Sequence, residues 1–106
     1  MNGFEFYHFL FQNLVPGQMV SHPNGNNNVY NFIQWIGNDI NDMSLQFDMH
    51  NGNIKSIPRN IIELAKEAFN ADQDVIINGP WLIQNEYNRG SCAASVLRFL
   101  LETYQD

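Results

Sequence analysis

The sequence has one cysteine, few charges and no long apolar run, and each of these absences excludes a class of protein. Cys92 is the single cysteine, so the chain can form neither an internal disulfide nor a cysteine-rich zinc site. No segment approaches the roughly 18 consecutive apolar residues of a membrane-spanning helix. The first segment, MNGFEFYHFLFQNLV, has no basic residue ahead of its apolar run, so no secretory signal is expected. We therefore expect a cytoplasmic protein that does not contact a membrane.

Positive charge is absent from the first half of the chain. Residues 1–54 hold no lysine or arginine, and the first basic residue is Lys55. The formal net charge is −6, and only 15% of residues are charged, against a quarter in a typical protein. Such a surface disfavours binding to nucleic acid and to anionic lipid. It suits a basic protein partner, although a surface that only keeps the chain in solution shows the same charge pattern.

The amino-terminal segment has the pattern of a capped helix over about residues 3–14. Asn2, followed three positions later by Glu5, is typical of a capping box. The apolar residues that follow occupy more than one face of such a helix. We therefore expect either deep burial or a subunit contact, most simply in a homodimer. The expected interface consists of Phe4, Tyr7, Phe11 and Leu14.

The middle of the chain contains one ambiguous segment and one clear hairpin. In VYNFIQWIGNDI the apolar spacing favours a helix, whereas the β-branched and aromatic residues favour a strand. We predict a helix over residues 28–37. In MSLQFDM apolar and polar residues alternate, which predicts a strand. The Asn-Gly pair that follows at 51–52 predicts a turn and a return strand near 53–57.

The second half predicts two further helices and one strand. Pro58 is expected to open a helix whose inward face is apolar and whose outward face is charged. The outward residues are Arg59, Glu63, Lys66 and Glu67. DVIINGPWLIQNEY predicts a strand near 74–84, and CAASVLRFLLETY predicts the last helix. Together these elements predict one compact α+β domain over 1–106. Its small, mostly antiparallel sheet would combine the hairpin near 43–57 with the 74–84 strand, packed by three or four helices.

Cys92 is the strongest candidate for chemistry in the chain. Ser91 is a good N-cap, and the start of a helix stabilises a thiolate. Residues 90–94, Gly-Ser-Cys-Ala-Ala, resemble the Gly-Ser-Cys-x-Ala stretch of the papain-like cysteine proteases. That family places its histidine after the cysteine, whereas no histidine follows Cys92. We therefore favour a small, buried residue at a helix start over a nucleophile.

A second resemblance concerns the order of four residues along the chain. The order His22, Asp48, Gln84, Cys92 is similar to the catalytic order in the ubiquitin-like-protein proteases. This resemblance implies a cysteine nucleophile assisted by the other three residues. The chain departs from that family's Asp-Cys-Gly, with serine and alanine flanking Cys92. The alternative of a cysteine-dependent hydrolase rests on these residues alone.

Two other groups of residues are candidates for ligand binding. Asp48 and His50 share the polar face of the predicted strand and supply two of the three or four ligands of a metal site. A solvated strand is the simpler interpretation, and we expect no metal and no cofactor. The aromatic residues that lie either in the core or around a small-molecule pocket are Trp35, Trp81, Tyr87 and Tyr30.

The sequence therefore leaves three functions open, and we favour the first. This is a small, acidic, non-catalytic protein that acts through a homo-oligomeric or protein–protein interface. The second is a small-molecule-binding module with an aromatic pocket. The third is the hydrolase that would use Cys92.

Overall fold

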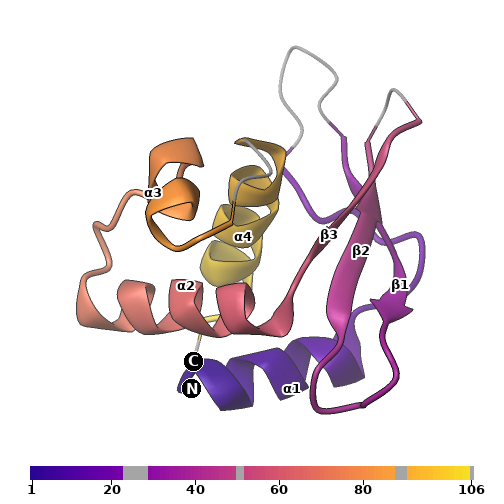
Figure 1. Ribbon diagram of the computed structural model, residues 1–106, viewed down its shortest axis with the longest axis horizontal. Coiled ribbons are helices and arrows are strands. Elements are labelled where there is room, and N and C mark those ends of the chain that lie inside the picture. Colours follow the sequence, from indigo (N-terminus) through magenta and orange to yellow (C-terminus); the bar gives the residue numbers. More distant parts are fainter. Residues whose placement is uncertain (23–28, 50–51, 88–90, 106) are drawn as a thin grey trace.

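The helices and strands of the computed structural model follow one another as α1 (Gly3–Asn13), β1 (Asn31–Ile36), β2 (Ser44–Asp48), β3 (Ile54–Ile57), α2 (Arg59–Ala71), α3 (Gly79–Gln84) and α4 (Ser91–Thr103). The structure describes residues 1–22, 29–49, 52–87 and 91–105. The strands form one antiparallel sheet in the order β1-β2-β3. In Figure 1 the sheet occupies one side of the molecule, α2, α3 and α4 the other, and α1 runs beneath them. The α+β fold predicted from the sequence is confirmed.

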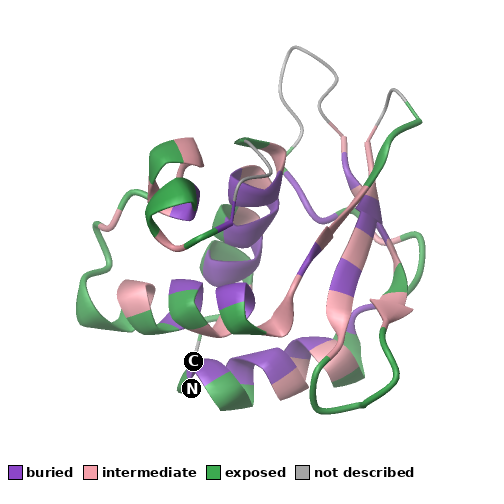
Figure 2. Cartoon of the chain, in the orientation of Figure 1, coloured by how far each residue is buried: buried purple, intermediate pink, exposed green. Residues whose placement is uncertain are grey.

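The predicted hairpin is present as β2 and β3. Leu45 and Phe47 point into the core and are fully buried, as the alternation in the sequence predicts. Gly52, in the connection between β2 and β3, has a φ of +85°, a conformation that glycine adopts without strain. Figure 2 shows that buried residues gather where the sheet and the helices face one another.

The helix predicted over 28–37 is wrong, because β1 occupies residues 31–36. Its register against β2 shifts between Phe32 and Gln34, which marks a β-bulge. The extra residue brings Phe32 and Trp35 to the same side of the sheet, with ring centroids 5.8 Å apart. A spacing of three is typical of a helix, so the bulge gives this strand a helical pattern in the sequence.

The strand predicted near 74–84 is also wrong, because residues 79–84 form the short helix α3. The Asn78 side chain caps this helix by accepting a hydrogen bond from the Trp81 backbone N–H at 3.0 Å. Pro80 lies in the first turn, where its missing N–H costs nothing. The Gly-Pro pair therefore begins a helix within the segment that was expected to be a strand.

The carboxyl end of α3 has an unusual residue at its cap. The Glu86 N–H donates to Ile83 O at 3.1 Å and the Tyr87 N–H donates to Leu82 O at 2.8 Å, which together form a Schellman motif. Glu86 takes the left-handed position with φ of 64°, where glycine is the usual residue. Leu82 and Tyr87 are both buried, as the motif requires of its apolar pair.

Replacing Glu86 with glycine is expected to stabilise the fold by about 0.5–1 kcal/mol. The left-handed conformation costs a non-glycine residue about 1–2 kcal/mol, and the greater freedom of glycine in the unfolded chain offsets part of that gain. Urea denaturation of Glu86→Gly against the parent chain measures the difference. Gln84→Gly is the matched control, because Gln84 lies within the helix and its replacement should be destabilising. Equal effects of the two substitutions would contradict this account.

Helix α2 differs from the prediction at one position. Ile61, Ile62 and Ala65 face the core as expected, but Lys66, predicted to face outward, is only 2% exposed. Its Nζ lies 5.3 Å from the ring centroid of Phe6 and 5.6 Å from that of Phe69. Burial, the largest effect, lowers the pKa of Lys66, and the nearby Glu67 opposes that shift. The contacts with two aromatic rings explain why Lys66 is buried, although the charge pattern around it in the sequence is typical of a solvated helix face.

A short segment between α1 and β1 runs alongside the first half of β1. The Gly17 N–H donates to Phe32 O, the Phe32 N–H to Gln18 O, and the Val20 N–H to Tyr30 O, at 2.7 to 2.9 Å. The Gln18 side chain also donates to the Tyr104 hydroxyl at 2.6 Å. These contacts join the amino-terminal third of the chain to both the sheet and the end of α4.

Candidate functional site

Cys92 lies at the start of α4 and is half-buried. The Tyr30 hydroxyl donates a hydrogen bond to its Sγ at 3.6 Å. Burial of Tyr30, followed by the influence of Cys92, raises the pKa of this tyrosine to about 12. Tyr30 therefore stays protonated at neutral pH and acts as a donor to the sulfur, not as a base that activates it.

The stability of the fold is expected to decrease as the pH rises from 10 to about 12. An unfolded tyrosine has a pKa of about 10, whereas the folded chain holds the pKa of Tyr30 at about 12. Between these values the unfolded chain has released a proton that the folded chain keeps, so unfolding becomes more favourable. The contribution of Tyr30 is complete below pH 10.

Urea midpoints measured across this pH range test the expectation. Burial also raises the pKa of Tyr7, so Tyr30→Phe should reduce the slope without abolishing it. An unchanged slope in Tyr30→Phe would show that Tyr30 titrates normally in the folded chain.

The residues expected to assist Cys92 each have other neighbours. His22 Nε2 lies 2.9 Å from Glu102 Oε2, near the opposite end of α4, which at 1.5 Å per residue is about 15 Å from Cys92 along the helix. His22 and Glu102 line a polar pocket of about 240 Å³ with Ser95 and Arg98. Asp48 accepts from the Asn31 N–H at 3.2 Å, within the sheet. Gln84 is exposed at the end of α3. The contacts of His22, Asp48 and Gln84 therefore give the thiol no general base.

Of the two metal candidates, the structure describes only Asp48. Asp48 lies on β2, and His50 falls outside the described residues. Among the residues that the structure does describe, no three histidine, cysteine or carboxylate side chains come close enough to hold a metal ion.

The four aromatic residues predicted for a ligand pocket are distributed through the core. Trp35 packs against α1, with its ring centroid 5.5 Å from that of Tyr7 and 5.4 Å from that of Phe11. Tyr30 and Tyr87 are 6% and 7% exposed, and the Tyr87 hydroxyl donates to the Ser56 carbonyl. Trp81 lies on α3, partly buried against the core. These positions favour packing as their role, because each residue contacts a different part of the core.

The predicted interface on α1 separates into buried and exposed residues. Tyr7 is 0% exposed and Leu14 is 7% exposed, so both belong to the core of this chain. Phe11 is half-buried against Trp35. Phe4 is 57% exposed. Of the four residues, Phe4 is therefore the one whose side chain is most available to a partner.

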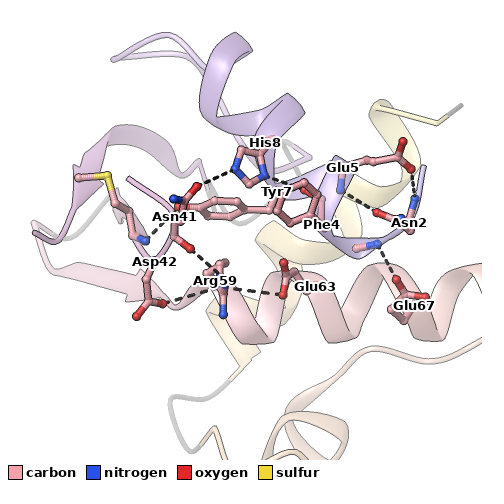
Figure 3. A network of polar contacts seen from close by, with 12 residues as sticks. Asn2, Phe4, Glu5, Tyr7, His8, Asn41, Asp42, Arg59, Glu63 and Glu67 are labelled. Atoms are coloured by element: carbon pink, nitrogen blue, oxygen red, sulfur yellow. Dashed lines mark hydrogen bonds and ion pairs between the residues drawn. The ribbon is translucent and has the colours of Figure 1, made fainter. Parts of the chain in front are cut away.

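Phe4 lies at a groove between the start of α1 and the side of α2 (Figure 3). The groove has a volume of about 500 Å³. Opposite Phe4 lies Leu64, an α2 residue that is 43% exposed. The lining residues are Asn2, Gly3, Phe4, Asn60, Glu63, Leu64 and Glu67. We call this site the α1–α2 groove.

The groove exists because α1 and α2 approach closely at Gly3. A Cβ atom on Gly3 would lie 2.8 Å from the Glu63 carbonyl oxygen, so only glycine fits this crossing. The Gly3 N–H donates to Glu67 Oε1 at 2.5 Å. The predicted capping box is confirmed, since Asn2 Oδ1 accepts from the Glu5 N–H and Glu5 Oε1 accepts from the Asn2 N–H. The capping box fixes the first turn of α1, and the bond from Gly3 to Glu67 holds that turn against α2.

Negative charge surrounds the groove. Glu63 and Glu67 line it, and Glu5 lies nearby on the first turn of α1 (Figure 3). Arg59 approaches one of these groups, with its Nε 3.9 Å from Glu63 Oε2 and 3.7 Å from Asp42 Oδ1. Its Nη1 also donates to Asn41 O at 3.0 Å, which directs it toward the 39–42 turn. One guanidinium shared between two carboxylates leaves the groove acidic.

This groove is not predicted from the sequence. The spacing of Glu63 and Glu67 along α2 is typical of a solvated helix face, and Leu64 belongs to no predicted site. One signal was present: residues 60, 63, 64 and 67 share a helix face, and Leu64 is an apolar residue outside the core stripe. The other wall depends on where α1 packs, which the spacing of residues along α2 does not reveal.

Comparison of the chain with models of known protein families, with curated proteins and with solved structures gives no match. Within the described part of the chain, no helix combines the length and the apolar character needed to cross a bilayer.

Proposed function

We propose that this chain is a non-catalytic binding protein that docks a basic segment of a partner protein in the α1–α2 groove. The observation that carries this proposal is the exposure of Phe4 and Leu64 on opposite walls of a groove lined by Glu63 and Glu67. Exposed apolar side chains inside a polar rim are typical of docking sites. A basic partner complements the rim, because opposite charge speeds encounter and disfavours other partners.

A partner of different composition fits the groove better than a second copy of this chain. The net charge of −6 means that two copies repel each other at long range. Two of the four residues expected in a homodimer contact, Tyr7 and Leu14, are occupied in the core of their own chain. The groove supplies both an apolar contact and a charge preference, whereas the contacts of Cys92 with the residues that the structure describes supply neither a base nor a ligand set.

Site-specific photo-crosslinking in cells that express the full chain tests this proposal. A photoreactive amino acid replaces Leu64, in the groove, or Ile76, which is 70% exposed and lies outside it. We expect a crosslinked partner at position 64 and not at 76. We also expect the yield to fall when Glu63 and Glu67 are both changed to glutamine and when the salt concentration is raised.

Two outcomes would contradict the proposal. Crosslinks of equal yield at both positions would indicate non-specific contact. A product with twice the mass of the chain would show self-association at the groove and would support the homo-oligomer predicted from α1.

A further inference from the structure

We infer that the α1–α2 groove selects an arginine beside an apolar side chain in the bound segment. This inference rests on the proposed function and specifies its chemistry. The apolar side chain packs between Phe4 and Leu64, and the guanidinium binds the carboxylates of Glu63 and Glu67.

The apolar half of the groove is fixed before a partner arrives. The ring of Phe4 packs against that of His8, with centroids 4.2 Å apart and planes tilted by 41°, and His8 Nδ1 lies 3.0 Å from the Phe4 carbonyl oxygen (Figure 3). His8 Nε2 is 3.3 Å from Asn41 Oδ1, which ties the imidazole to the 39–42 turn. His8 therefore acts as a positioning residue for Phe4. A side chain held in one orientation loses less conformational entropy when a partner binds.

The charged half consists of two carboxylates one helical turn apart. Glu63 and Glu67 have the i, i+4 spacing that places side chains on the same face of α2. Glu67 uses Oε1 to accept from the Gly3 N–H, which leaves acceptor positions on its other oxygen. Glu63 approaches Arg59 only at 3.9 Å, and its side chain is 24% exposed. Both carboxylates therefore keep capacity for an incoming donor.

Arginine fits this arrangement better than lysine. A guanidinium carries five N–H donors in a planar fork and is able to bridge two carboxylates, whereas an ammonium is a point charge. The guanidinium plane also stacks on an aromatic face, and more than half of Phe4 is exposed beside the carboxylates. The arginine needs an apolar neighbour in the bound segment, because burial of Phe4 and Leu64 stabilises the complex only if an apolar group covers them.

Nuclear magnetic resonance titration of the isotope-labelled full chain tests the inference. The probes are synthetic glycine–serine peptides of equal length that carry two Arg-Leu, Lys-Leu, Glu-Leu or Arg-Ser pairs. The Arg-Leu peptide should shift the amide signals of Gly3, Phe4, Leu64 and Glu67. The Lys-Leu and Arg-Ser peptides should bind about threefold to tenfold more weakly, and the Glu-Leu peptide should not bind.

Matched variants separate the groove from general acidity. Glu67→Gln keeps an oxygen that accepts from Gly3, removes one charge and should weaken the Arg-Leu peptide about fivefold. Glu86→Gln removes the same charge outside the groove and should leave the affinity unchanged. Leu64→Ala should lower the affinity for the Arg-Leu peptide but not the affinity for the Arg-Ser peptide. Far-ultraviolet circular dichroism of each variant checks that it is folded.

The outcomes distinguish this inference from the function on which it rests. If the Arg-Leu and Lys-Leu peptides bind the groove equally well, the proposed function stands and arginine selection is wrong. If basic peptides bind but shift other residues, the groove is not the site. If no basic peptide shifts any described residue, the proposed function and this inference both fail.

Discussion

Gly3→Ala is expected to lower the free energy of unfolding by about 2 kcal/mol, although alanine is the better helix former. The added Cβ would lie 2.8 Å from the Glu63 carbonyl oxygen and 3.0 Å from Glu63 Cα. These are backbone atoms that cannot rotate away, so α1 and α2 must move apart. The movement also lengthens the bond from the Gly3 N–H to Glu67 Oε1, now 2.5 Å. Urea denaturation followed by tryptophan fluorescence measures the loss.

Gly79→Ala provides a matched control. Gly79, like Gly3, is the first residue of a helix and follows a capping asparagine. A Cβ on Gly79 would meet no atom within 4 Å. Gly79→Ala should therefore leave the fold unchanged or stabilise it by about 0.5 kcal/mol, because alanine restricts the unfolded chain. If both variants lose stability, the effect at Gly3 results from its position at the start of a helix and not from the close approach of α1 and α2.

Tyr7→Phe should destabilise the fold by about 1–3 kcal/mol, although the aromatic ring remains. The Tyr7 hydroxyl donates to Ile40 O at 3.1 Å and accepts from the Met43 N–H at 2.9 Å. Both partners belong to the stretch between β1 and β2, so the phenol holds that stretch against α1. Without it, a backbone donor and a backbone acceptor lose their partner in a partly buried place. Urea denaturation gives the global loss, and hydrogen exchange at the Met43 amide should become faster.

Tyr104→Phe is the corresponding control for Tyr7→Phe. The Tyr104 hydroxyl accepts one hydrogen bond, from the Gln18 side chain at 2.6 Å, and Tyr104 is only half-buried. An amide that loses this partner turns to water, so the expected loss is below about 1 kcal/mol. If Tyr104→Phe costs as much as Tyr7→Phe, burial of the backbone partners is not the reason for the larger effect.

The sequence predicts the α+β fold, both long helices of the second half and the hairpin, because each has a regular apolar period. It fails at residues 28–37, where a bulge in β1 imposes a spacing of three on a strand. It also fails at 74–84, where the Asn78 cap decides between strand and helix. In both cases one local hydrogen-bonding detail outweighs propensity.

The candidate site was less accessible from the sequence than the fold. The apolar pattern of α1 indicates Phe4, but together with Tyr7 and Leu14, which lie in the core. The charge pattern of α2 predicts an exposed Lys66, since nothing along that helix indicates that Phe6 and Phe69 lie beside its amine. The groove arises from the contact between two helices that lie far apart in the sequence. Such a juxtaposition depends on tertiary packing, which residue spacing within one helix does not encode.

The segment at residues 17–20 has a consequence for the behaviour of the chain at high concentration. A β-strand at the edge of a sheet offers unpaired N–H and C=O groups to other molecules, which favours aggregation. The bonds from Gly17, Gln18 and Val20 occupy such groups on Tyr30 and Phe32. At the opposite edge, the Tyr87 hydroxyl occupies the Ser56 carbonyl of β3. The chain thus pairs edge groups on both sides of the sheet with its own residues, which disfavours the addition of a strand at those positions.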